Sequence, residues 1–263
     1  MSIRVLSTIT ALLIPAVVVA QAPRVGPAHG AVLVVGGGSL GPEVLGKFIE
    51  LAGGPDAIIV DVPTAGGDSV YPADWQGTRS LKAAGAKHVV VRLTDPTLFQ
   101  CPFIMMTEVG AAYMDDAEAE ALRNYLLKGG FLWADDFWGE WAWEAWMEQF
   151  GKALPAALYP VKDVPKDHPL FRALFDIGGG VPQIASIGNW LGTGSTSERG
   201  AESAVPHARA VFDASGRILA LMTHNTDIGD SWEEEASNPQ YFYEFSTKGY
   251  AFGVNAIVFG MTH

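Results

Sequence analysis

Short apolar runs alternate along the first half of the chain with segments whose apolar residues recur at helical spacing. Five such runs predict buried strands: AVLVV, DAIIV, KHVVVRL, PFIMM and FLWADD. Strands that are apolar on both faces and are separated by helices are typical of a parallel sheet covered on both sides. The right-handed crossover rule then favours a doubly wound layout. We therefore predict an α/β fold with a doubly wound, mostly parallel sheet.

The second half of the chain is less regular. The segment ARAVFDASGRILALMTHN predicts two strands around a turn at Asp213–Gly216. A stretch rich in proline and glycine precedes it and includes a short predicted helix near Leu170–Phe175. The final segment, KGYAFGVNAIVFGMTH, has the apolar spacing of a closing helix. No linker separates two units convincingly, so residues 21–263 are predicted to form a single domain.

The first twenty residues have the pattern of a cleaved export signal. Arg4 lies in a short basic start, an apolar run follows from Val5 to Val19, and the small residue Ala20 precedes Gln21. A buried N-terminal helix or a membrane anchor are the alternatives, but the run is short for a membrane span and Pro15 interrupts it. We therefore expect an exported protein, periplasmic or secreted, with no stable membrane span after signal cleavage.

The composition restricts the partners and the redox chemistry. The 29 acidic and 17 basic residues give a formal net charge of −12, which argues against nucleic acid and anionic membrane as partners because both are polyanions. Cys101 is the only cysteine, so the chain has no intrachain disulfide. Its apolar neighbours in FQCPF indicate a buried, unreactive thiol.

Two adjacent acids end the predicted strand FLWADD. Asp135 and Asp136 stand where many α/β hydrolases hold a serine or cysteine nucleophile on a sharp turn between strand and helix. One of them could simply cap the next helix or accept hydrogen bonds from loop amides. The second acid still needs an explanation. Because functional groups collect at the carboxyl ends of parallel strands, we expect Glu108, which ends the preceding strand, to face the same crevice.

The segment THNTDIGDSWE follows the second strand of the predicted hairpin and carries His224, Asn225, Asp227 and Asp230. A histidine with nearby acids is typical of an oriented general base or of a metal site. Asn and Asp are also ordinary turn residues, so a plain turn is the alternative.

Four tryptophans follow the adjacent acids within a few residues, and they are too densely spaced to share one helix face. Core packing is the default for them, and a stacking platform for a flat ligand is the alternative. The candidate ligand-binding residues are Asp135, Asp136, His224, Glu108, Asn225, Asp227 and Trp138. Asp136 and His224 are also the candidate metal ligands, while no catalytic residue or cofactor is assigned.

Several motifs in the C-terminal two thirds resemble one family. YPADW, LRNYLLKGGFLWADDFWG, DHPLFRALFDI, GRILALMTHNTDIGDSWE and the final GYAFGVNAIVFGMTH are similar in content and order to the domain of unknown function 4159 family. That resemblance implies a class I glutamine-amidotransferase-like, flavodoxin-like fold and supplies no activity.

The N-terminal stretch GAVLVVGGGSLGPEVLGKFIELAGG resembles the start of cyanophycinase-like serine peptidases. The resemblance implies a catalytic serine in the elbow after the strand GGFLWADD, but Asp135 and Asp136 stand there instead. Peptidase activity is therefore not expected.

Together these observations predict an exported protein that binds a small or polymeric ligand at the strand-end crevice and lacks a Ser/Cys nucleophile. A carboxylate- or metal-dependent hydrolase is one alternative, with His224 as base or ligand. A non-catalytic component of a cell-envelope assembly is the other.

Overall fold

The computed structural model describes residue 33, residues 41–60 and 78–90, and residues 92–263. The predicted signal peptide, the glycine turn at Gly36–Gly38 and the loop Thr64–Asp68 lie outside these residues, as does the predicted strand 31–35 apart from Leu33. Over the described residues, no helix has the length and apolar character needed to cross a membrane.

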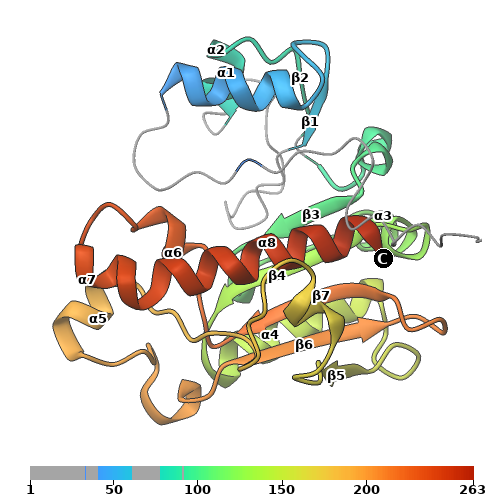
Figure 1. Cartoon of the computed structure of the whole chain (residues 1–263). Helices are drawn as coiled ribbons and strands as arrows, with labels where there is room; N and C mark the ends of the chain where they lie inside the picture. The colour runs from blue at the N-terminus through green and yellow to red at the C-terminus, as the bar shows by residue number, and fades with distance from the viewer. Residues whose placement is uncertain (1–32, 34–40, 61–77, 91) are drawn as a thin grey trace, which may run out of the picture.

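A five-stranded sheet forms the centre of the molecule, in the order β3-β4-β7-β6-β5 (Figure 1). Its strands are β3 (Phe103–Met106), β4 (Phe131–Phe137), β5 (Val161–Asp163), β6 (His207–Phe212) and β7 (Ile218–His224). The pairs β3–β4 and β4–β7 are parallel, whereas β6 is antiparallel to both of its neighbours. The prediction of an α/β fold with a mostly parallel sheet is therefore confirmed.

The predicted strands at DAIIV and KHVVVRL do not join this sheet among the described residues. They form a separate parallel pair, β1 (Ile58–Val60) and β2 (His88–Val90), beside helices α1 (Pro42–Leu51) and α2 (Arg79–Ala83). The apolar pattern predicts that a strand is buried but does not state which neighbour it pairs with, so it could not separate the two sheets.

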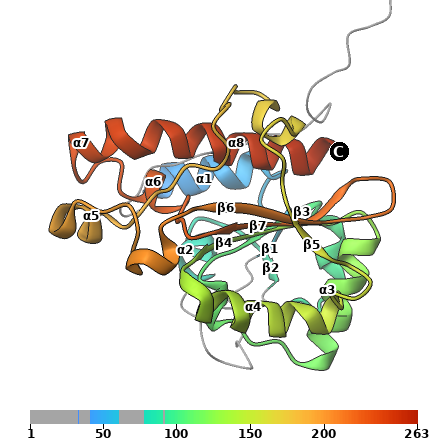
Figure 2. The same ribbon diagram turned by 90° about the horizontal axis from the view of Figure 1, so that it is seen from below.

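Helices cover both faces of the five-stranded sheet (Figure 2). Helices α3 (Asp116–Leu127) and α4 (Gly139–Ala153) lie on one face, and α8 (Thr247–Thr262) lies on the other. Strand β4 contributes side chains to the hydrophobic cores on both faces of the sheet, because successive side chains of a strand point to opposite faces. Leu132 packs in the core under α3 and α4, and Trp133 packs in the core under α8. This double burial explains the continuous apolar run in its sequence.

Local sequence signals set several element boundaries. Asp115 caps α3 and forms a capping box with Glu118, as the acids at the start of that helix predict. The predicted helix near Leu170–Phe175 is a 3₁₀ helix, η5 (Pro169–Arg172). The remaining short elements are η3 (Pro96–Gln100), η4 (Val109–Ala111), α5 (Ile187–Thr193), η6 (Gly200–Ser203), α6 (Asp230–Glu233), α7 (Pro239–Tyr241) and the π-helical turn η7 (Phe242–Ser246).

Helix α8 packs so closely against α6 that one of its glycines has no room for a side chain. A Cβ atom at Gly249 would collide with the side chain of Ser231, which is fully buried. Gly249→Ala should therefore lower the free energy of unfolding by about 1.5 kcal/mol, although alanine is the better helix former. The matched control is Gly151→Ala in α4, where a Cβ meets nothing within 4 Å. Urea denaturation should show no loss for the control, and an equal effect at both sites would contradict the packing argument.

Candidate functional site

Each of the three mutually parallel strands, β3, β4 and β7, has a residue with a left-handed backbone at or just after its carboxyl end. Glu108 follows β3 with φ 52°, Asp136 lies near the end of β4 with φ 55°, and Asn225 follows β7 with φ 62°. Among the described residues, these are the only residues other than glycine with positive φ. Such conformations cost free energy and cluster at functional sites. The strained positions therefore mark the carboxyl edge of the sheet as the candidate site.

The backbone bend at Asp136 turns the two adjacent acids in different directions. The pairing of β4 with β7 shifts register between Ala134 and Phe137, so the strand bulges at the two aspartates. Asp136 lines a pocket and accepts a hydrogen bond of 3.1 Å from Nε1 of Trp138. Asp135 points into the protein instead.

Asp135 is fully buried and holds the loop after β7 in place by hydrogen bonds. It accepts a short hydrogen bond from the hydroxyl of Thr223, and its second oxygen accepts from the backbone amides of Ile228 at 2.9 Å and Gly229 at 3.1 Å. Burial raises the pKa of this carboxyl group, while the hydrogen bond from Thr223 opposes the shift. Asp135 thus has the role foreseen for one acid of the pair: it accepts hydrogen bonds from loop amides and lines no ligand pocket found here.

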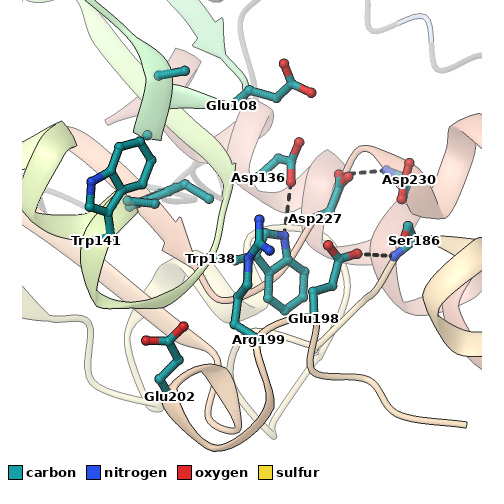
Figure 3. A pocket seen from close by; sticks show the side chains of 14 residues that line it. Glu108, Asp136, Trp138, Trp141, Ser186, Glu198, Arg199, Glu202, Asp227 and Asp230 are labelled. Carbon is teal, nitrogen blue, oxygen red and sulfur yellow. Dashed lines mark hydrogen bonds between the residues drawn. The ribbon is translucent and has the colours of Figure 1, made fainter. Parts of the chain in front are cut away.

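Asp136 opens into a cavity of about 640 Å³, called here the acidic pocket (Figure 3). Side chains from distant parts of the chain line it. The charged members are Glu108, Asp136, Glu198, Arg199, Glu202, Asp227 and Asp230. Trp138, Trp141 and Ser186 are also part of the lining. Six carboxyl groups thus surround a space in which the lining includes one cationic side chain.

The carboxyl groups of the acidic pocket accept hydrogen bonds from uncharged donors but have no cationic partner among the described residues. Glu198 accepts a hydrogen bond of 2.7 Å from the backbone amide of Ser186, and Asp227 accepts one of 2.8 Å from the amide of Asp230. Within the described part of the chain, no ion pair joins Arg199 or any carboxylate of the pocket to an opposite charge. The pocket therefore carries negative charge that the protein itself leaves unbalanced.

The mutual repulsion of these acids adds to the effect of their burial. Burial raises the pKa of Asp136 to about 6, and the nearby charges of Glu108 and Glu198 add to the shift. Burial raises the pKa of Asp230 to about 7, helped by the charge of Asp136. Burial also raises the pKa of Asp227. Near neutral pH the pocket thus holds carboxyl groups that retain protons, chiefly because they are buried and also because their neighbours are negatively charged.

His224 lies in a second cavity, of about 480 Å³, called here the histidine pocket. Its lining consists of Glu140, Trp143, Glu144, Glu202, His207, Arg209, His224 and Asn225. The Nε2 atom of His224 is 3.0 Å from the carbonyl oxygen of Gly139 and must donate to it, since a carbonyl only accepts. Burial lowers the pKa of His224 to about 4, and the charge of Arg209 contributes, so the ring is neutral at pH 7.

The structure does not bring all the predicted site residues into one crevice. Glu108, Asp136, Trp138, Asp227 and Asp230 line the acidic pocket, whereas His224 and Asn225 line the histidine pocket. Asn225 is also structural: its side chain accepts from the amide of Gly139 at 2.9 Å and donates to the carbonyl of Val205 at 3.0 Å.

The predicted metal ligands Asp136 and His224 do not meet in a common cavity, because each lines a different pocket. In the described ranges, no group of three histidine, cysteine, aspartate or glutamate side chains is arranged to hold a metal ion. Asp136 and His224, the candidate metal ligands, therefore do not form a metal site with each other or with other described residues.

Several residues of both pockets were not predicted. Glu198 and Arg199 lie in an irregular segment and Glu202 lies in the one-turn helix η6, and neither is long enough for a periodic pattern to predict the direction of a side chain. His207 and Arg209 lie on the first strand of the predicted hairpin, which brings them beside the second strand. The register shift between Val211 and Phe212, which the turn does not predict, sets His207 opposite His224. The imidazole rings of His207 and His224 stack with their centres 6.0 Å apart.

The tryptophans of α4 differ in exposure, as expected because their spacing does not place them on one helix face. Trp146 is fully buried in the core, whereas Trp141 is 73% exposed at the acidic pocket. Trp143 lies between, at the histidine pocket. Cys101 is half-buried rather than buried, and burial raises the pKa of its thiol, which keeps it protonated and unreactive.

Comparison with known proteins gives one finding. A family profile described as "Domain of unknown function (DUF4159)" matches residues 76–261, which include both pockets and the whole five-stranded sheet. No curated protein matches the chain.

Proposed function

Because the chain belongs to the family described as Domain of unknown function (DUF4159), its function has to be argued from the site, and we propose that it binds a cationic organic ligand in the acidic pocket. The protein is exported, to the periplasm or beyond, and its scaffold is amidotransferase-like and flavodoxin-like without a Ser/Cys nucleophile. The observation that carries the proposal is the set of carboxyl groups around the pocket without cationic partners.

The charge of the pocket selects the ligand class. Six carboxyl groups face one guanidinium, so a bound ammonium or guanidinium group would remove repulsion that raises the pKa of Asp136 and Asp230. The exposed indole of Trp141 at the same pocket offers a face for a cation or for the flat part of a ligand. A cavity of about 640 Å³ has the size of a small-molecule site.

The backbone at Asp136 supports the amidotransferase-like scaffold. In α/β hydrolases the nucleophile stands on a strained turn between a strand and a helix. Asp136 has φ 55° between the body of β4 and the start of α4 at Gly139, so it has the backbone strain of an elbow with a carboxylate in place of the nucleophile. The export of the protein is supported by the signal-like pattern of residues 1–20.

Binding of polyamine probes to the full chain tests the proposal. Isothermal titration calorimetry with spermidine should show saturable binding that weakens at least about tenfold in Asp136→Asn or Asp227→Asn, since each removes a charge-assisted contact. The matched control is Asp116→Asn, an exposed residue of α3 away from the pocket. The dicarboxylate succinate should not bind. Unaltered spermidine binding in both pocket variants, or preferential binding of succinate, would refute the proposal.

A carboxylate-dependent hydrolase is the second candidate, and the raised pKa values favour it. A carboxyl group that stays protonated near pH 7 can act as a general acid beside an ionised neighbour, and Asp227 and Asp136 have different degrees of burial and different neighbours. Hydrolysis of nitrophenyl glycosides that is lost in both Asp136→Asn and Asp227→Asn, but kept in Asp116→Asn, would favour this function over ligand binding alone.

A further inference from the structure

The histidine pocket contains an arginine that the fold holds in one place. The guanidinium of Arg209 lies 4.3 Å from the ring centre of Trp143. Its Nε donates to Asp163 at 3.3 Å, and Nη1 is 3.3 Å from Nδ1 of His224. Because Nε2 of His224 donates to Gly139, Nδ1 carries the lone pair and accepts from Arg209. These contacts leave Nη2 of Arg209 with no protein acceptor among the described residues.

The two histidines extend this side of the pocket. His207 and His224 stack with their rings 6.0 Å apart and 20° from parallel, as cross-strand neighbours of β6 and β7. Trp143 packs on His224 at 5.1 Å. The result is an aromatic surface with a fixed cation at its edge, built from three elements of the domain core.

The opposite charge lines the same pocket. Glu140 and Glu144 are one turn apart on α4 and are both exposed, and Glu202 joins them from η6. None of these three carboxylates forms an ion pair in the described part of the chain. The pocket thus combines a cationic point with an acidic wall, in contrast to the acidic pocket, and the two cavities share Glu202.

We propose that the histidine pocket is a second binding site, for a small zwitterion that carries a carboxylate and an ammonium group. The carboxylate binds Nη2 of Arg209, the ammonium group lies against Glu140 and Glu144, and the connecting carbons pack on the ring of Trp143. A simple anion is disfavoured by the acidic wall, and a simple cation by Arg209. This site is independent of the function proposed for the acidic pocket.

Calorimetric titration of the full chain with a series of ω-amino acids tests the site. The probes are glycine, 4-aminobutyrate and 6-aminohexanoate, with butyrate and butylamine as singly charged controls. At least one of the three zwitterions should bind at least about tenfold more tightly than both controls, because it satisfies both charges at once. Absence of binding by all three zwitterions, or butyrate binding as tightly as the best of them, would overturn the proposal.

Variants separate this site from packing effects and from the acidic pocket. Arg209→Gln should weaken zwitterion binding by about tenfold or more. Because Arg209 also packs on Trp143, the double variant Glu140→Gln/Glu144→Gln provides a second test at exposed positions that the fold does not need. It should weaken zwitterion binding and leave butyrate binding unchanged or tighter.

Glu148→Gln is the matched control, since Glu148 is the next exposed acid along the same helix and lies outside the pocket. Asp136→Asn should also leave zwitterion binding intact, even if spermidine binding is lost. Zwitterion binding that survives Arg209→Gln and the double variant, or that falls equally in Glu148→Gln, would place the binding elsewhere and overturn the assignment.

Discussion

Asp135→Asn should lower the free energy of unfolding by about 3 kcal/mol, measured by urea denaturation at pH 7. The carboxyl group of Asp135 is fully buried and accepts from the hydroxyl of Thr223 and from the amides of Ile228 and Gly229. An asparagine keeps one acceptor oxygen but turns an NH₂ group toward at least one of these donors. A buried donor then loses its partner and faces another donor, which costs more than the hydrogen bond itself contributed.

The neighbouring residue provides the matched control for this prediction. Asp136→Asn makes the same chemical change one residue along the chain, but Asp136 opens into the acidic pocket and faces other carboxylates. It should leave the stability unchanged or raise it. If Asp136→Asn destabilised the protein more than Asp135→Asn, the assignment of a structural role to one acid and a pocket role to the other would be reversed.

Asp135 also positions the acidic pocket without lining it. The amides that it binds, those of Ile228 and Gly229, lie in the loop that carries Asp227 and Asp230. This loop is also held to the segment before α5: the amide of Asp227 donates to the carbonyl of Ile184 at 2.9 Å, and the hydroxyl of Thr226 donates to the carbonyl of Pro182 at 2.9 Å. Loss of the Asp135 contacts should therefore weaken spermidine binding as well as stability, whereas Asp136→Asn should weaken binding alone.

The stability of the protein should fall by about 2 kcal/mol between pH 6.5 and 8.5. The pKa of Asp230 is raised to about 7, and that of Asp227 is raised as well, above their values in the unfolded chain. The folded state therefore binds more protons than the unfolded state in this range, and stability decreases as the pH rises through the folded pKa values. Urea midpoints at several pH values measure the effect.

The histidines affect the stability mainly below this pH range. The pKa of His224 is lowered to about 4, so its stability effect has the opposite sign: stability is lost as the pH falls below about 6.5, where the unfolded chain gains a proton that the folded protein does not bind. The pKa values of His207 and His168 are lowered as well, mainly by burial, and the contribution of all three histidines fades within about one pH unit above 6.5, whereas that of the carboxyl groups continues. Asp227→Asn should flatten the slope, Asp116→Asn should not, and saturating spermidine should also reduce it, because a bound cation favours the ionised carboxylates. A stability that rises with pH in this range would contradict the account of the pocket.

Local patterns in the sequence were sufficient to predict the strand and the helix start at the centre of the fold. The continuous apolar run of FLWADD predicts a strand buried on both faces, and Leu132 and Trp133 indeed pack into opposite cores. The acids at Asp115 and Glu118 predict the start of α3 and form its capping box. These features depend on residues that are close in the chain, so local pattern is sufficient to predict them.

The predicted edge of the sheet was also informative about the candidate site. The sequence analysis selected three acids that lie at or after predicted strands, and all three line the acidic pocket: Glu108, Asp136 and Asp227. Their binding of a ligand remains a prediction. The sequence could not separate the two aspartates, however, because the turn of the backbone at Asp136 and the register shift in β4 arise only when β4 pairs with β7.

Which side chains share a cavity depends on the packing of the whole fold. Glu198 reaches the acidic pocket from an irregular segment and Glu202 from the short helix η6, both more than sixty residues along the chain from Asp136. The position of such a segment depends on what it packs against rather than on its own pattern. The same packing places His224 and Asp136 in separate pockets, although both end neighbouring strands. The type of an element follows from periodicity, whereas strand pairing depends on tertiary contacts. The direction of a side chain at a strand end depends on one or two backbone angles, and the contacts of the whole fold fix those angles.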